Sequence, residues 1–311
     1  MKVFRAENTI PSFYGGSLLI LCISNPSRFH PMKNPLKNPR YFLHLSLLLL
    51  PFMAACKKQT LILQQQPAAE KKYALVWSDE FDQAGPPDAL KWNYDVGGHG
   101  WGNNELQYYT KSSPENARVE NGFLVIETRK EKLGTNNYTS ARLVTKGKGD
   151  WQYGRVEVKA KLPAGRGTWP AIWMLASTTP LKWPEDGELD IMEHVGFDPG
   201  VVHANIHTKA YNHSINTNKG NKISVPDATQ AFHVYSMEWD AEKIVFLMDG
   251  KAYFTFANDK QNNPATWPYN QPFHLLLNIA VGGNWGGSKG IDDSIFPQRM
   301  EVDYVRVYQQ K

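Results

Sequence analysis

The sequence predicts an all-β protein in which two sheets pack as a sandwich. Residues 155–162 (RVEVKAKL) alternate apolar and polar side chains, which is the period of a strand with one buried face. Residues 243–256 form two β-rich runs joined by Asp-Gly at 249–250, a typical hairpin signal, and residues 273–281 and 300–308 predict further strands. Gly and Pro recur throughout and no long stretch keeps a helical period, so many short strands favour the sandwich.

The first 55 residues differ in charge from the rest of the chain. They hold six Lys or Arg and one acid, a surplus of +5 in a 311-residue chain of formal net charge +4, so the remainder carries −1. A near-neutral remainder removes the electrostatic support for nucleic-acid binding. Because both cysteines, Cys22 and Cys56, lie early, the chain after residue 56 can form neither an internal disulfide nor a cysteine-ligated metal site.

Residues 32–55 have the form of a bacterial lipoprotein signal peptide. A basic start is followed by an apolar stretch at 41–53 of secretory length, which is too short for a comfortable membrane span. MAAC at 53–56 resembles a lipobox, whose cysteine becomes the lipidated N-terminus, and an ordinary signal peptide cleaved near the same place is the alternative. Because a complete signal-peptide pattern begins at Met32, we interpret residues 1–31 as the product of a start codon assigned too early.

The chain after the signal divides into a tether and a folded domain. Residues 56–72 are polar and Gln-rich, as expected of a tether that starts at the lipidated Cys56, and residues 73–311 form the predicted domain. Lys57 supplies no Asp-type signal for retention in the inner membrane. We therefore expect an exported protein, anchored by its lipid alone at the bacterial outer membrane or cell surface, with a monomeric domain.

The stretch GELDIMEHVG at 187–196 places three acids within six residues. Glu188 and Asp190 share a face of a strand, whereas Glu193, five residues after Glu188, would point to the other face of a regular strand. One extra residue inserted after Asp190 would form a β-bulge and return Glu193 to the acidic face. The broken alternation therefore predicts a bulged strand with all three acids on one face.

The spacing of these acids has a chemical interpretation. With the bulge, the two glutamates lie roughly 13 Å apart between Cα atoms, and side chains that reach about 4 Å bring the carboxyls within about 5 Å. Retaining glycosidases need this separation, and Asp190 between the glutamates can share a proton and keep their pKa values apart. A solvated polar face, a calcium site and a surface for a basic partner remain alternatives, although crowded like charges cost stability.

Five segments together resemble glycoside hydrolase family 16, in its laminarinase branch. They are the bulged E-x-D-x-x-E pattern in DGELDIMEHVG and the segments GWGNNELQYYT (100–110), GRGTWPAIWML (165–175), FHVYSMEW (232–239) and NIAVGGNWGG (278–287). The resemblance covers about residues 76–308. It implies a curved β-jelly-roll sandwich with a substrate cleft on its concave face.

The resemblance also implies an activity, the endo-hydrolysis of β-1,3-glucan such as laminarin with retention, extended in some members to mixed β-1,3-1,4 glucan. By position, Glu188 is the implied nucleophile, Asp190 the assisting acid and Glu193 the general acid/base. A β-glucan-binding lectin on the same sandwich is an alternative, which the intact pair of glutamates disfavours. A family member acting on agar, carrageenan or xyloglucan is another; the bulged motif disfavours xyloglucan, and the laminarinase-like segments disfavour the marine galactans.

Aromatic residues are candidates for binding sugar rings. All ten tryptophans lie after residue 76, which suggests that some of them line a groove. Trp169 and Trp173 lie four residues apart on one face of a strand, and flat indoles suit the apolar faces of sugars, although core packing is the alternative. Trp285, in a Gly-rich loop, has room to act as a mobile platform for a sugar.

Polar residues complete the candidate cleft. His203, Asn205 and His207 share one face of the expected neighbouring strand, and His207 resembles a family position beside the catalytic acids, with a surface histidine as the alternative. Asn103 and Arg142 resemble family residues that hold sugar hydroxyls, and Arg142 could equally pair with a structural acid.

The resemblance implies no cofactor for catalysis and a structural calcium on the convex face of the sandwich. By position its ligands would be Glu80 or its main chain, the Gly122 carbonyl and Asp303. No local calcium-binding loop is visible in the sequence, so this expectation depends on the resemblance alone.

Overall fold

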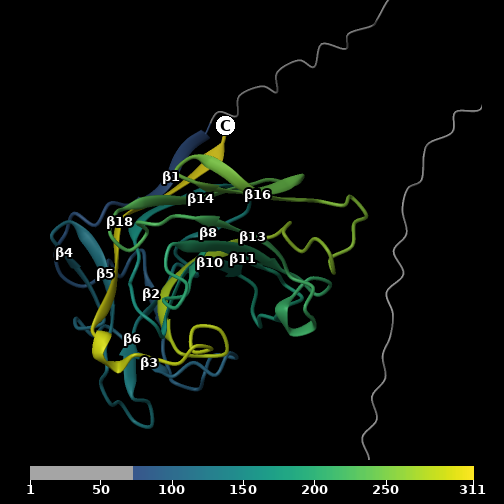
Figure 1. Cartoon of the computed structure of the whole chain (residues 1–311). Coiled ribbons are helices and arrows are strands. Elements are labelled where there is room, and N and C mark those ends of the chain that lie inside the picture. Colours follow the sequence, from purple (N-terminus) through teal and green to yellow (C-terminus); the bar gives the residue numbers. More distant parts are fainter. Residues whose placement is uncertain (1–72) are drawn as a thin grey trace, which may run out of the picture. The chain divides into compact units, whose positions relative to one another are not determined.

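Strands supply almost all the regular structure of residues 73–311, the part of the chain that the computed structural model describes (Figure 1). The first sheet has the order β16 (Lys251–Ala257), β15 (Lys243–Met248), β14 (His233–Trp239), β9 (Gly154–Lys161), β18 (Gln298–Gln310), β5 (Phe123–Thr128) and β4 (Ala117–Glu120), with β1 (Tyr73–Asp79) also paired to β18. The second has the order β13 (Lys219–Ser224), β12 (Val201–His207), β11 (Glu188–His194), β10 (Thr168–Ala176), β17 (Phe273–Val281), β7 (Arg142–Val144) and β2 (Asn93–Asp95), with β8 (Asp150–Trp151) paired to β17. Both sheets are antiparallel throughout, which confirms the predicted two-sheet all-β fold.

Two smaller features complete the described part of the chain. β3 (Gln107–Tyr109) and β6 (Tyr138–Ser140) form a short parallel pair, which the sequence did not predict. The helical turns are the 3₁₀ helices η1 (His213–Ile215) and η2 (Asp293–Ile295). Across residues 73–311, no helix has the length and apolar character needed to cross a membrane.

The predicted strands are present. The alternating run at 155–162 becomes β9, the run at 273–281 is β17, and the run at 300–308 lies within β18. The hairpin of β15 and β16 turns at residues 249–250, where both residues have positive φ (47° and 75°), as the Asp-Gly signal requires. The segments 1–31, 32–55 and 56–72, and with them the lipid anchor predicted at Cys56, lie outside the described residues.

The core lies between the two sheets and fixes which side chains face outward. Leu189 of β11, Ile172 and Met174 of β10 and Val158 of β9 are all fully buried in one apolar cluster. Because side chains alternate along a strand, the residues between them must point away from the core. The opposite face of the second sheet is therefore free to carry polar and aromatic side chains.

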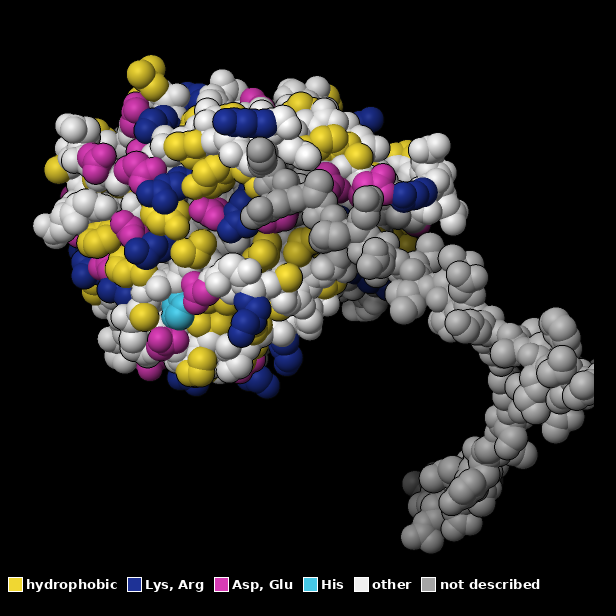
Figure 2. All heavy atoms as spheres, turned by 90° about the horizontal axis from the view of Figure 1, so that it is seen from above, with side chains coloured by type: hydrophobic (Ala, Val, Ile, Leu, Met, Phe, Trp, Pro, Cys, Tyr) yellow, Lys and Arg dark blue, Asp and Glu magenta, His cyan; other side chains and the backbone are white. Residues whose placement is uncertain are grey.

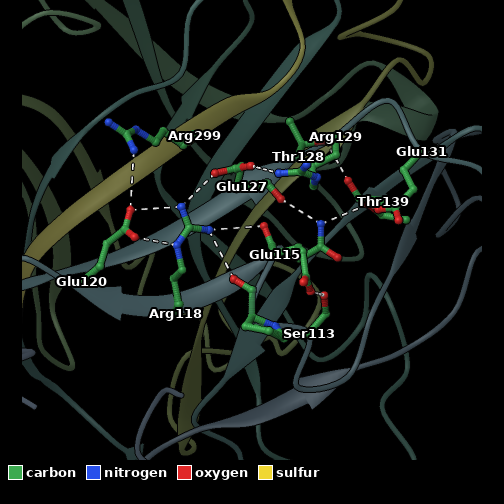
Figure 3. Close-up of polar contacts among 12 residues, drawn as sticks. Ser113, Glu115, Arg118, Glu120, Glu127, Thr128, Arg129, Glu131, Thr139 and Arg299 are labelled. Atoms are coloured by element: carbon green, nitrogen blue, oxygen red, sulfur yellow. Dashed lines mark hydrogen bonds and ion pairs between the residues drawn. The ribbon is translucent and has the colours of Figure 1, made fainter. Parts of the chain in front are cut away.

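A polar cluster ties the hairpin of β4 and β5 to the segment before β6 (Figure 3). Arg118 of β4 donates to Glu120 (2.8 Å from Nε) and to Glu127 of β5 (2.9 Å from Nη2), and Glu127 also pairs with Arg129. Asn116, before β4, donates from Nδ2 to Oγ1 of Thr139 in β6 at 3.1 Å, so the cluster also connects this hairpin to β6, which pairs with β3.

The surface seen in Figure 2 carries charges of both signs. Lys and Arg side chains are interspersed with Asp and Glu side chains on this face, and apolar side chains lie between them (Figure 2).

We expect Gly196→Ala to destabilise the fold by about 2–3 kcal/mol, because a Cβ at Gly196 would lie 1.8 Å from the main-chain oxygen of Gly165. Gly250→Ala is the control, since a Cβ there meets no atom within 4 Å and costs only the strain of a positive φ, about 1 kcal/mol. Urea unfolding of both variants measures the difference. An equal loss in the two variants would contradict the close approach of the loops that flank β10 and β11.

Candidate active site

A β-bulge in β11 brings the three acids of GELDIMEHVG onto one face. Along β10, adjacent residues Ile172 and Trp173 pair with Met192 and Asp190, so β11 contains one extra residue. The same shift occurs against β12, where Asp190 pairs with Asn205 and Glu193 pairs with His203. Ile191 and Met192 are consecutive and both buried in the core. The predicted bulge is therefore present, and Glu188, Asp190 and Glu193 all face away from the core.

Glu188 accepts a hydrogen bond from one neighbouring segment and lies near a histidine of another. The indole Nε1 of Trp183 donates a 2.7 Å hydrogen bond to its Oε2, and Nε2 of His207 lies 3.8 Å from its Oε1. The same His207 nitrogen lies 3.2 Å from Oδ2 of Asp190. Tyr269 fixes the backbone beneath them, because its hydroxyl donates to the carbonyls of Glu188 (3.3 Å) and His207 (3.1 Å).

Glu193 receives one hydrogen bond on each oxygen. Trp169 Nε1 donates to Oε1 at 3.1 Å and Asn205 Nδ2 donates to Oε2 at 2.9 Å. The amide of Asn205 is oriented in turn by Asn218, whose Nδ2 donates to Asn205 Oδ1 at 3.2 Å. The carboxyl of Glu193 is thus fixed by β10 on one side and by β12 on the other.

Burial and mutual repulsion determine the protonation of the acids. Burial raises the pKa of Asp190 well above its usual range, and the charges of Glu188 and Glu193 raise it further. Burial also raises the pKa of Glu193; the charge of Glu188 adds to this, while His207 and the hydrogen bonds from Asn205 and Trp169 oppose it. The site therefore favours a protonated Asp190 between its neighbours and a Glu193 that keeps its proton to higher pH than an ordinary glutamate does.

An arginine stack forms one wall beside the acids. The guanidinium of Arg142 lies between the rings of Trp101 (4.8 Å) and Trp173 (4.7 Å), and its Nε forms a 3.0 Å ion pair with Asp95. Trp173 is oriented by Asn278, whose Oδ1 accepts from the indole Nε1 at 2.7 Å. The pairing of Arg142 with an acid, considered from the sequence, is therefore present within the cleft wall.

A buried carboxylate that the sequence did not single out lies behind this wall. Glu105 is 9% exposed and accepts hydrogen bonds from Gln107 (2.7 Å), Asn103 (3.3 Å) and the hydroxyl of Tyr109 (3.4 Å). Burial raises the pKa of Glu105. The network continues to the acids' side of the sheet, because Asn278 Nδ2 donates to the Tyr109 hydroxyl at 3.0 Å. The sequence signal that could have identified this group is the spacing of residues 105, 107 and 109, which places them on one face of an extended segment.

The wall on the other side of the acids is aromatic. The ring of Trp285 contacts Trp169 edge to face, with centroids 5.5 Å apart, and His203 at 4.9 Å. Two adjoining hollows open around Glu188 and Glu193. All seven residues predicted to bind substrate line them: Asn103, Arg142, Trp169, Trp173, Asn205, His207 and Trp285. The structure thus brings the predicted residues together, and it adds Trp101, Glu105, Trp183, His213 and Asn278 to the site.

The side chains predicted to hold calcium are engaged by cations of the protein. Both oxygens of Glu80 accept from Arg306 (3.0 and 2.8 Å), and Asp303 pairs with Lys159 at 2.7 Å. Because these carboxylates are paired with Arg306 and Lys159, they do not fit a calcium site. Main-chain carbonyls such as that of Gly122 remain as candidate ligands, and calcium binding stays a prediction. Within the described residues, the group with metal-ligand composition and spacing is Glu188, Asp190 and His207, the acids of the cleft itself.

Known proteins are similar to this chain in sequence and in fold. The profile of the glycosyl hydrolases family 16 matches residues 104–306. A β-glucanase of Rhodothermus marinus is 57% identical over 243 residues, which cover 76% of this chain and 85% of that protein.

Solved structures agree with the sequence matches. The X-ray structure of the laminarinase from Rhodothermus marinus has a TM-score of 0.76 at 55% identity, over 78% of this chain and 99% of that one. A variant of a non-specific endo-β-1,3(4)-glucanase of family GH16, crystallised with 1,3-β-D-cellotriosyl-glucose, has a TM-score of 0.75 at 52% identity, over 78% and 96%. The resemblance found in the sequence is confirmed.

We expect Asp190→Asn to raise the free energy of unfolding at pH 7 and to lose that advantage near pH 4. The folded-state pKa of Asp190 is raised, so the stability from its bound proton is complete below the unfolded pKa of about 4 and is lost as pH rises through the folded pKa. An amide cannot ionise and avoids this loss. Thermal unfolding at both pH values measures the effect, with Asp82→Asn at an exposed position as control. An equal effect of Asp190→Asn at both pH values would contradict the raised pKa.

Proposed function

Because this chain belongs to family 16 of the glycosyl hydrolases, we infer that it is a retaining endo-β-1,3-glucanase of the laminarinase type. One observation carries the chemistry: the bulge of β11 sets Glu188 and Glu193 on one face with Asp190 between them. Since relatives of this family include a non-specific endo-β-1,3(4)-glucanase, mixed β-1,3-1,4 glucan is proposed as a second substrate.

The first step transfers the sugar to the protein. An oxygen of Glu188 forms a bond to the anomeric carbon while the glycosidic bond breaks, and Glu193 gives its proton to the leaving oxygen. The raised pKa of Glu193 supports this role, because an acid must hold its proton at the working pH. Hydrogen bonds from Trp169 and Asn205 fix the direction in which Glu193 presents that proton.

The second step returns the sugar to water with net retention. Glu193, now ionised, takes a proton from water as the water oxygen bonds to the anomeric carbon, and the ester bond to Glu188 breaks. Asp190 keeps a proton beside Glu188, so the charge that returns to Glu188 meets a neutral neighbour.

The hollows on both sides of the acids support cutting within a polysaccharide. Trp101, Arg142 and Trp173 form one wall, and Trp285 with His203 forms the other, so sugar units can be bound before and after the cleaved bond. A lectin would need these walls but would have no use for two glutamates held at fixed orientations by Trp183, Trp169 and Asn205. The arrangement of the acids therefore favours the enzyme over the binding protein.

Laminarin should be the best substrate among common glucans and should be cut internally. Purified enzyme is incubated with laminarin, lichenan, agarose and carboxymethyl cellulose, and the products are sized over time. Oligosaccharides of several lengths should appear early from laminarin. Glucose as the sole early product would contradict internal cutting, and faster turnover of agarose would contradict the substrate assignment.

Glu188→Ala and Glu193→Ala should each lower kcat by about 10²- to 10⁴-fold, because each step loses its nucleophile or its proton donor. Azide distinguishes the two with an activated aryl glycoside. Glu193→Ala still forms the intermediate and should give the β-glycosyl azide, whereas azide replaces the lost carboxylate of Glu188→Ala and should give the α-azide. Proton NMR of the products reads the anomers. Swapped anomers would reverse the assigned roles, and Glu185→Ala in the exposed loop before β11 is the control.

Export and a lipid anchor at Cys56 are also proposed, on the signal pattern at 32–55 and the polar tether after it. Cells of a Gram-negative host that express the full chain are labelled with a palmitate analogue. Wild type and Cys22→Ala should take up label, and Cys56→Ala should not. Equally low labelling of all three would show that the protein is not a lipoprotein.

A further inference from the structure

A loop tryptophan contacts the carboxylate to which the proposed mechanism gives the role of nucleophile. Trp183 lies between β10 and β11, five residues before Glu188, and its Nε1 donates a 2.7 Å hydrogen bond to Glu188 Oε2. Trp183 is 37% exposed, so burial in the core does not explain its placement. The indole instead lies at the rim of the cleft with its polar atom directed at a reacting group.

Two histidine rings contact this indole. His213 of η1 has its ring centroid 5.1 Å from that of Trp183, with the planes at 38°, and His207 of β12 lies 6.0 Å away. The two histidines also contact each other edge to face, with centroids 5.2 Å apart. These contacts hold an otherwise exposed side chain so that its N–H meets Glu188.

Building on the proposed function, we propose that Trp183 is a catalytic residue that stabilises Glu188 as the leaving group of the second step. When the covalent intermediate forms, Glu188 gives an electron pair to the anomeric carbon, the glycosidic bond breaks, and the carboxylate becomes a neutral ester. When water attacks, the ester C–O bond breaks, the electron pair and the negative charge return to Glu188, and the proton of the water goes to Glu193.

The strength of the Trp183 hydrogen bond changes with that charge. A hydrogen bond to an ionised acceptor is about twice as strong as one to a neutral acceptor. The indole N–H therefore stabilises the carboxylate of Glu188 more than the ester. This difference speeds the second step, in which the carboxylate is released, and does not speed the first step, in which it is consumed. Loss of this bond should lower the rate constant of the second step relative to the first by about tenfold.

The test measures both steps in the full-length protein. Trp183→Phe removes the N–H, and replacement of Trp183 by benzothienylalanine removes only the N–H, because sulfur takes its place in a ring of the same shape. Stopped-flow release of dinitrophenol from 2,4-dinitrophenyl β-laminaribioside gives the first step as a burst and the second as the steady state. Both variants should show a larger burst amplitude than wild type and a ratio of second-step to first-step rate constants about tenfold lower.

Trp77→Phe is the matched control, because it removes an indole that packs against Trp92 and Trp151 and lines neither of the two hollows around Glu188. Its ratio of rate constants should equal that of wild type. A ratio within about twofold of wild type in both Trp183 variants would overturn the proposal, as would an equal slowing of the two steps. If the wild-type protein releases no dinitrophenol, the proposed hydrolysis is wrong. This result differs from failure of the proposal for Trp183, in which wild type releases dinitrophenol and the Trp183 variants keep its ratio of rate constants.

Discussion

One extra residue in β11 is the constraint on which the site depends. A regular strand from Glu188 to His194 would direct Glu193 into the apolar layer between the sheets, where an ionised carboxylate is costly. The bulge buries Ile191 and Met192 together and returns Glu193 to the outer face. Because β11 is paired on both sides, to β10 and to β12, the register of both neighbours fixes this distortion in place.

Three acids on one face are tolerated because each is supplied with a donor or a proton. Trp183 donates to Glu188, while Trp169 and Asn205 donate to Glu193. Asp190 is buried, and burial together with the charges of its two neighbours raises its pKa well above the usual range, so a bound proton removes one charge from the group. The repulsion that makes such a cluster unfavourable on an ordinary surface thus keeps the protonation states of the acids apart, as acid–base chemistry requires.

The walls of the cleft are built from segments far apart in the chain. β17 is buried along its whole length, because the core covers one face, while on the other face Leu276 packs with Val144 and Leu175 and Asn278 joins the Glu105 network. That network and the stack of Arg142 between Trp101 and Trp173 rigidify the wall beside the acids. The wall beside Glu188 and Glu193 therefore has support that extends through Asn278 of β17 to Tyr109 of β3.

The sequence alone predicted the bulge, the three acids and longer strands such as β9, β17 and β18, because the pattern of apolar residues along a strand is a local property of the chain. The short pair of β3 and β6 was not predicted. The E-x-D-x-x-E spacing predicted that Glu188, Asp190 and Glu193 lie on one face of their strand. The Asp-Gly pair predicted the hairpin of β15 and β16. Only the tertiary structure decided which groups meet those acids. Asp95 reaches Arg142, and Asn278 joins Trp173 to Tyr109, because β2, β7, β10 and β17 become neighbours in one sheet. Such contacts leave no local signal, since they join residues whose separation along the chain says nothing about their distance in space.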